Sequence, residues 1–314
     1  MSTNITTYKD LYKSHISDKA NYIIIKYDPT KNNYQYRPYS HYATPDAIDN
    51  LSKLIIDDMV FYAFTEEEIV NYHNQFGLLD DMKKAAKFAY ESRIPKRKNP
   101  NTDGTPGEVL LDILIQVYEP QSEKLIARAK YKQLGDNSEI KNYDAMYFTR
   151  DKDNIYLWLG QVKSGSCSYC KSDIKDDLNK KYVLDYLAKS MFYIAQRNEN
   201  NSLTPILNQI NKIYFDAIDS NWSQEYKVQK IVELFNDNNI KLMIPCLLAY
   251  TADIYSSQSE LECRVNSCTE EIVDYFDSLS FDINEKLNYE ILYYVFPIQN
   301  VQILREKVGS IKKK

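Results

Sequence analysis

Three ionisable side chains between residues 106 and 163 have types suited to metal-ion chemistry, and each lies at the edge of a hydrophobic element. Glu108 precedes an apolar run, Asp144 precedes an aromatic run, and Lys163 ends a third run. Carboxylates are ligands for Mg²⁺ and related hard cations, and an ammonium group stabilises developing negative charge. The ends of regular elements hold such groups rigidly. The sequence therefore predicts a metal site with an accompanying cation in this stretch.

The residues after Glu108 predict a helix. Their apolar positions fall on one helical stripe, which comprises Leu110, Leu111, Leu114, Ile115 and Tyr118. Glu108 is therefore expected in the first turn. A structural alternative is a capping box between Thr105 and Glu108, which would occupy the same carboxylate with free backbone amides.

Asp144 and Lys163 are expected on a β-hairpin. Residues 143–148 and 155–163 are rich in aromatic and branched side chains, and a polar run separates them. The structural alternatives are that Asp144 ends a strand or bonds a turn, and that Lys163 extends its ammonium group from a strand end into solvent.

The register of this hairpin decides which side chains meet. If Phe148 pairs with Ile155, Asp144 lies opposite Leu159. Alternate strand residues share a face, so one face would carry Asp144, Leu159, Gln161 and Lys163. A slip of one residue would undo this convergence.

The order of these residues resembles the PD-(D/E)xK nuclease fold, which has an acid on a helix, an Asp at a strand start and an acid-x-Lys on the next strand. Four segments further resemble the HamA/AbpA family: Gly107–Leu111, Tyr143–Met146, Leu157–Lys163 and Tyr293–Ile298. HamA is the nuclease subunit of the Hachiman antiphage system and acts with a helicase partner, HamB. The resemblance implies an α/β (α+β) fold with a restriction-endonuclease-like core, in which a mixed sheet is flanked by helices, and a mainly helical N-terminal region.

The resemblance also implies a mechanism, metal-assisted hydrolysis of DNA. Glu108, Asp144 and the Gln161 carbonyl would hold Mg²⁺ or Mn²⁺, and Lys163 would orient the attacking water or stabilise charge at phosphorus. The family pattern has an acid where this chain has Gln161, which brings no negative charge. The alternative function is a catalytically degenerate nuclease fold that serves as a structural or regulatory subunit of a helicase.

No phosphate-binding G-x-x-x-x-G-K-[ST] loop is present, so any unwinding of DNA would need a separate ATPase. This agrees with the helicase partner that the resemblance implies. None of the histidines His15, His41 and His73 lies in a histidine-based nuclease or protease motif. Cys167 and Cys170 form a CxxC pair that could bind zinc only with two distant cysteines, and reduced thiols are the favoured interpretation.

The composition predicts a soluble globular protein, because 44% of the 314 residues are hydrophobic and 26% are charged. No apolar run reaches the length of a membrane span, so cytoplasmic residence without a membrane partner is expected. The Pro-containing, basic segment 94–105 predicts a boundary between an N-terminal region, residues 1–95, and a nuclease domain, residues 96–314.

The net charge of −5 gives no general sign of nucleic-acid binding, so any DNA contact must be local. Three basic clusters flank the predicted site: Arg93 with residues 96–98, Arg128 with Lys130 and Lys132, and Lys171, Lys175, Lys180 and Lys181. Each could hold phosphates, although solvation of exposed faces is the commoner role of such residues.

Further elements follow from periodicity and from turn residues. Strands are expected at 21–27, 34–37, 240–250 and 289–296, with Pro245 favouring an edge or a bulge. Helices are expected at 45–62, from Thr65, and at 78–90, 172–197, 205–213, 222–236, 260–279 and 301–308.

Overall fold

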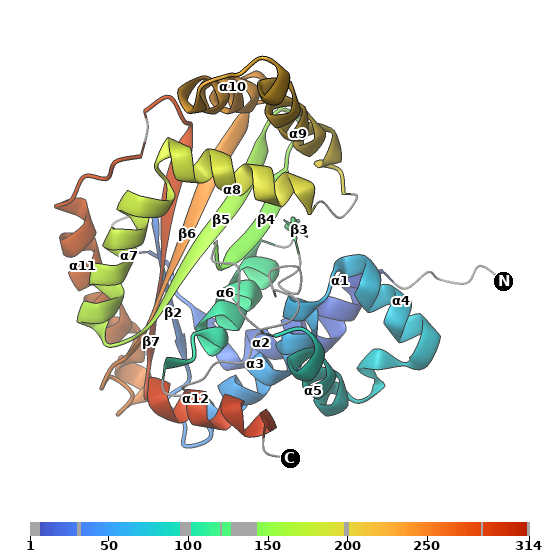
Figure 1. Cartoon of the computed structure of the whole chain (residues 1–314). Coiled ribbons are helices and arrows are strands. Elements are labelled where there is room, and N and C mark those ends of the chain that lie inside the picture. The colour runs from blue at the N-terminus through green and yellow to red at the C-terminus, as the bar shows by residue number, and fades with distance from the viewer. Residues whose placement is uncertain are drawn as a thin grey trace.

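The computed structural model describes residues 7–29, 33–94, 102–119, 121–126, 143–197, 201–283 and 285–312. In these ranges one mixed sheet runs through the molecule, with the strand order β1-β2-β7-β6-β5-β4-β3, and helices cover both of its faces (Figure 1). The predicted α+β class, a mixed sheet flanked by helices, is confirmed.

The centre of the sheet is parallel and its two ends are antiparallel. The β5–β6, β6–β7 and β2–β7 pairs are parallel, whereas the β1–β2, β3–β4 and β4–β5 pairs are antiparallel. Parallel strands covered on both faces need continuous apolar runs, as β6 and β7 have. The strands are β1 Ile24–Lys26, β2 Tyr36–His41, β3 Glu123–Lys124, β4 Ala145–Arg150, β5 Ile155–Gly165, β6 Ile240–Thr251 and β7 Tyr289–Ile298.

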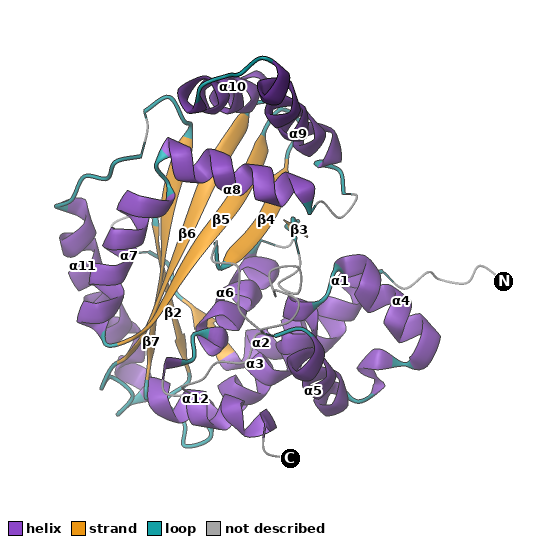
Figure 2. Cartoon of the chain, in the orientation of Figure 1, coloured by secondary structure: helices purple, strands orange, loops and turns teal. Residues whose placement is uncertain are grey.

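The two faces of the sheet carry separate hydrophobic cores. Figure 2 shows helices on both sides of the strands. The α6 core, which includes Leu111, Trp158 and Val162, lies under α1 Tyr8–Tyr12, α2 Asp18–Ile23, α3 Ala47–Ala63, α4 Glu66–Phe76, α5 Met82–Ser92, α6 Thr105–Tyr118 and α12 Val301–Gly309. The α7 core, which includes Leu159 and Ile174, lies under α7 Cys167–Lys181, α8 Leu184–Gln196, α9 Thr204–Asp219, α10 Gln224–Asp237 and α11 Leu261–Asp277. The mainly helical N-terminal region is confirmed, and its helices cover one face.

Helix α6 lies close against β5 because of a glycine. A Cβ atom at Gly107 would lie 2.8 Å from Cγ1 of Val162, which is too close for any other residue without displacement. Pro106 in the first turn favours helix initiation, since the missing N–H would be unpaired there in any case. The result is a buried helix whose first turn, with Glu108, lies beside the end of β5.

The hairpin register differs from the predicted one by two residues. Phe148 pairs with Leu157, and Arg150 with Ile155. The turn is shorter than predicted because the Asp151 carboxylate accepts hydrogen bonds from the backbone N–H groups of Asp153 and Asn154, at 3.0 and 2.8 Å. A shift of two residues preserves the faces of the paired strand residues, and Asp144 itself lies just before β4.

Pro245 was predicted to favour an edge or a bulge; the edge is wrong, because β6 lies between β5 and β7. The β5–β6 pairing is interrupted between the Trp158–Met243 and Gln161–Cys246 pairs. A Cβ at Gly160 would lie 3.0 Å from Cγ of Pro245. Proline is tolerated here because the ladder has a local gap and the neighbouring strand has a glycine.

The single helix predicted for residues 172–197 is two helices. α7 ends at Lys181, and α8 begins at Leu184 after an extended Val183 with ψ of 145°. The Tyr182 side chain is fully buried, and its hydroxyl donates to the Leu159 carbonyl at 2.7 Å. This anchor on β5 interrupts a sequence whose helical periodicity is otherwise continuous.

The N-terminal strand is also shorter than predicted, because α2 extends through Ile23 and only Ile24–Lys26 pairs with β2. The basic strand predicted around Arg128 lies outside the described residues. Strands β1 and β2 join the same sheet as β7, so residues on both sides of the predicted boundary near residue 95 share one sheet. The division into 1–95 and 96–314 stays a prediction. No helix within the described ranges is both long and apolar enough to cross a membrane.

Candidate functional site

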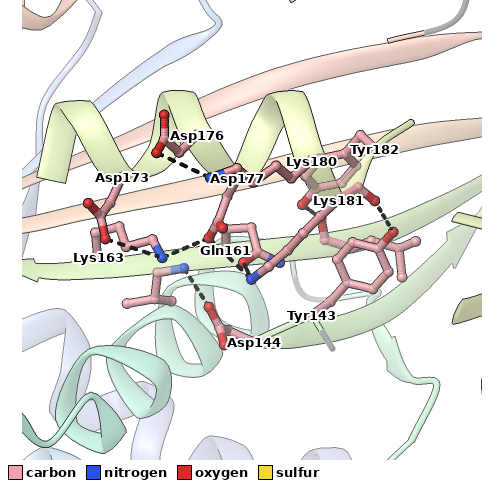
Figure 3. Close-up of polar contacts among 12 residues, drawn as sticks. Tyr143, Asp144, Gln161, Lys163, Asp173, Asp176, Asp177, Lys180, Lys181 and Tyr182 are labelled. Atoms are coloured by element: carbon pink, nitrogen blue, oxygen red, sulfur yellow. Dashed lines mark hydrogen bonds and ion pairs between the residues drawn. The ribbon is translucent and has the colours of Figure 1, made fainter. Parts of the chain in front are cut away.

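Asp144 is fixed on the edge of β5, at the point where β4 begins. Its backbone N–H donates to the Gly160 carbonyl at 2.8 Å, and its Oδ2 accepts from the Val162 N–H at 2.9 Å (Figure 3). Continuing the Ala145–Gly160 pairing places Asp144 next to Gln161. The aspartate and the Gln161-x-Lys163 segment therefore lie together, as the sequence predicts.

Gln161 and Lys163 point toward α7 (Figure 3). Gln161 is fully buried, and its Oε1 accepts a hydrogen bond from the Lys181 ammonium group. The Lys163 ammonium lies 2.7 Å from Oδ2 of Asp177, which α7 also supplies. Lys181 and Asp177 of α7, which the sequence analysis did not assign to the site, therefore contact the candidate positions Gln161 and Lys163, respectively.

The charge on Lys163 is favoured by its surroundings. Burial would lower the pKa of this ammonium group, but the hydrogen bond and charge of Asp177, with the charges of Asp144 and Asp173, outweigh burial and raise it. Lys163 therefore remains protonated at neutral pH. Its environment suits charge stabilisation rather than proton abstraction.

Glu108 does not form the capping box that was its structural alternative. Helix α6 has Gly104 as its N-cap and no side-chain cap, and the Thr105 N–H donates to Oδ1 of Asp103 at 3.0 Å. Oε2 of Glu108 instead accepts a hydrogen bond from the Tyr62 hydroxyl at 2.7 Å. The carboxylate is buried, with 6% of the residue exposed, and α3 supplies its partner.

Tyr62, which bonds Glu108, also lines a cavity. Tyr62 and Asp144 line one small cavity of about 20 Å³, together with Asp112 and Lys124. A cavity of that size holds about one water molecule. The tyrosine that bonds Glu108 thus lines the same cavity as Asp144, while the Gln161 amide oxygen is directed to α7.

A buried charge cluster beneath this cavity was missed by the sequence analysis. Lys124 lies 3.8 Å from Oδ1 of Asp112, and their side chains are 2% and 5% exposed. Asp112 also accepts hydrogen bonds from the Tyr147 hydroxyl and, at 2.6 Å, from the Gln116 amide. The sequence does contain a sign of this cluster: Asp112 interrupts an apolar helix. Asp112 also follows Glu108 by four residues, which places both on one face.

Asp58 of α3 belongs to the same cluster and is fully buried. Burial and the nearby charge of Asp112 raise the pKa of Asp58 well above its ordinary value. Burial likewise raises the pKa of Asp112, despite the opposing charge of Lys124. The cluster therefore favours a protonated Asp58 beside an Asp112–Lys124 ion pair.

The carboxylates of this region determine whether it can hold a divalent ion. Within the described ranges no group of three or more His, Cys, Asp or Glu side chains could hold a metal ion. Mg²⁺ needs only one or two protein carboxylates when waters and substrate phosphates complete its shell. Glu108 and Asp144 fit that requirement by their chemistry, whereas Oε1 of Gln161 already accepts from Lys181. The assignment of Glu108, Asp144, Gln161 and Lys163 to metal binding and catalysis stays a prediction.

The cysteines carry reduced thiols in the structure. Cys167 and Cys170 begin α7, Cys268 lies on α11, and Cys263 is exposed. Burial raises the pKa of the Cys170 thiol to about 12, so it remains protonated at neutral pH. A buried neutral thiol behaves as a small packing group.

Comparison with known proteins identifies a family. The HamA family model matches residues 12–311, which is nearly the whole chain. No curated protein and no solved structure matches the chain. The HamA family is part of the Hachiman antiphage system and works there with a partner, which supports a role in defence. On the extent of this match, the chain belongs to the HamA family.

Proposed function

We propose that this chain is an antiphage effector nuclease that hydrolyses DNA phosphodiester bonds with Mg²⁺ or Mn²⁺ and is regulated by a partner helicase. One observation carries the proposal: Asp144 is bonded to β5 at Val162, between Gln161 and Lys163. This is the arrangement expected for a PD-(D/E)xK nuclease site, with Gln161 at the position of the second acid. Membership of a defence family supports the same conclusion.

Each residue of the site has a separate role in this proposal. Asp144 and Glu108 would hold the metal ion, which when bound polarises the phosphate and lowers the pKa of a water. The Tyr62 hydroxyl orients the Glu108 carboxylate through their hydrogen bond. Lys163, held in its charged form, stabilises the negative charge that develops on the phosphoryl oxygens.

One observation favours a second candidate, a degenerate nuclease fold that serves as a helicase subunit. Gln161 lacks the negative charge of the family's acid, and its only ligand atom accepts from the Lys181 ammonium. A cationic group at that oxygen opposes the approach of a metal ion. In this alternative, the chain contributes binding to the helicase rather than chemistry.

Cleavage of plasmid DNA separates the two candidates. The purified chain is incubated with supercoiled plasmid and Mg²⁺ or Mn²⁺, with and without the partner helicase and ATP. The proposal expects metal-dependent cutting that is lost in Lys163→Ala. Cutting that persists in Lys163→Ala contradicts the site assignment, and tight helicase binding without cutting under any of these conditions supports the degenerate subunit.

A further inference from the structure

The last turn of α7 holds two adjacent lysines in different environments. Lys180 is a surface residue, with a side chain that is 72% exposed and lies 3.3 Å from Asp176. The Lys181 side chain is only 21% exposed, and its ammonium group donates to the buried Gln161 amide oxygen. Figure 3 shows Lys181 reaching back to the sheet, on the side where Lys163 lies.

Asp177 joins the two inward-facing lysines. Its Oδ2 lies 2.7 Å from the Lys163 ammonium and 3.2 Å from the Lys181 ammonium. Two cations around one anionic oxygen form the environment that a phosphate oxygen would also meet. Because both lysine side chains retain some exposure, at 17% and 21%, a ligand can approach them from solvent.

We propose that Lys163 and Lys181 form a two-lysine clamp for a backbone phosphate of the nucleic acid, and that Asp177 occupies this clamp in the free protein. The inference rests on the proposed function, because it identifies a second substrate-binding cation in the same site. Asp177 acts as an internal competitor that the phosphate displaces.

The clamp gives a physical reason for glutamine at position 161. An amide oxygen accepts a hydrogen bond from the Lys181 ammonium and orients it without adding a negative charge. A carboxylate at this position would form an ion pair with Lys181 and weaken its attraction for phosphate. Gln161 is therefore a positioning residue for Lys181.

DNA affinity measured in EDTA tests the clamp without cleavage. Labelled duplex DNA is titrated with the full chain over a series of salt concentrations. Each phosphate contact contributes about 0.9 to the slope of log affinity against log salt. Lys181→Gln is therefore expected to lower the magnitude of this slope by about 1 and to weaken binding roughly eightfold at 0.1 M salt. Lys181→Arg should retain the wild-type slope.

Two further variants make the test specific. Lys180→Gln is the matched control, and it should leave the slope and the affinity unchanged. Asp177→Asn should tighten binding several-fold, a gain that misfolding cannot produce. Equal effects of Lys180→Gln and Lys181→Gln, weaker binding by Asp177→Asn, or no salt-dependent binding by the wild type would overturn the clamp.

The clamp and the proposed function can fail separately. If the wild-type chain binds DNA through Lys181 but never cuts with Mg²⁺ or Mn²⁺, the clamp is supported and the nuclease function is contradicted. If the Lys181→Gln variant cuts normally and its salt slope is unchanged, the nuclease function is supported and the clamp is contradicted.

Discussion

The Asp144 carboxylate accepts a hydrogen bond at 2.9 Å from the backbone N–H of Val162, the residue between Gln161 and Lys163. This bond fixes an acid from one strand onto the backbone of its neighbour, so the carboxylate keeps its position without any bound ion. A preorganised group of this kind needs no rearrangement when a charged substrate arrives.

Two replacements of Asp144 should distinguish the role of its charge in cleavage from the role of its hydrogen bond in stability. In Asp144→Asn the amide oxygen can still accept from Val162, so stability should remain close to wild type while cleavage falls by roughly 100-fold or more. Asp144→Ala removes the acceptor as well and should cost about 1 kcal/mol in unfolding free energy. Urea denaturation and plasmid cleavage of both variants check this. A fully active Asp144→Asn would rule out a catalytic role for this carboxylate.

An acid at position 161 should change metal and DNA affinity in opposite directions. Gln161→Glu supplies a carboxylate, so the Mg²⁺ concentration for half-maximal cleavage should fall. It also pairs with Lys181, so binding of DNA in EDTA should weaken. The two titrations are made on the same preparation. Cutting by Gln161→Glu where the wild type shows none would instead favour the degenerate subunit.

The buried Lys124–Asp112 pair should behave as a unit in stability measurements. Lys124→Met leaves Asp112 without its cation and should lower the unfolding free energy by about 3 kcal/mol. Adding Asp112→Asn should recover much of the loss, because the uncompensated charge is removed. The unfolding free energies of the wild type, the two single variants and the double variant, measured by denaturant unfolding, form a double-mutant cycle that gives the interaction energy of the pair. Additive losses in the double variant would show that the two charges are independent.

His41 should make the protein less stable at mildly acidic pH. Burial lowers the pKa of His41 to about 4, and its Nε2 accepts from the Gln299 N–H at 3.1 Å, a bond that requires the neutral ring. The ordinary pKa is about 6.5, so the unfolded chain binds this proton first as pH falls. The contribution of neutral His41 to the free energy of unfolding is fully present above pH 6.5. It decreases by about 3 kcal/mol as the pH falls toward 4.

The difference between wild type and His41→Gln isolates this effect, because the carboxyl groups are common to both proteins. His41→Gln should lose less stability than wild type between pH 7 and pH 4.5 in urea denaturation. Parallel pH profiles for the two proteins would show that His41 does not control acid sensitivity.

Local patterns were sufficient to predict the elements that carry the site. Aromatic and branched side chains predicted the two strands of the hairpin, and a single apolar stripe predicted the helix of Glu108. The register was wrong by two residues because the Asp151 carboxylate closes a shorter turn than the polar run suggested. Because faces depend on odd or even spacing, an error of two residues leaves the faces of the paired strand residues unchanged.

Contacts between distant elements could not be predicted in the same way. The approach of Lys181 to Gln161 depends on where α7 ends, and Tyr182 sets that end by bonding to Leu159 on β5. The central position of β6 likewise depends on Gly160, which lies on another strand and makes space for Pro245. Each is a tertiary effect that overrides a local tendency.

In the proposed site, Glu108 and Asp144 bind one divalent ion beside Lys163. Anomalous diffraction from crystals of the full chain soaked in Mn²⁺ tests it most directly. One strong peak is expected within coordination distance of both carboxylates, and it should be lost in Asp144→Asn. A chain that cuts DNA with Mn²⁺ but shows no peak there, or a peak that is independent of Asp144, would contradict it.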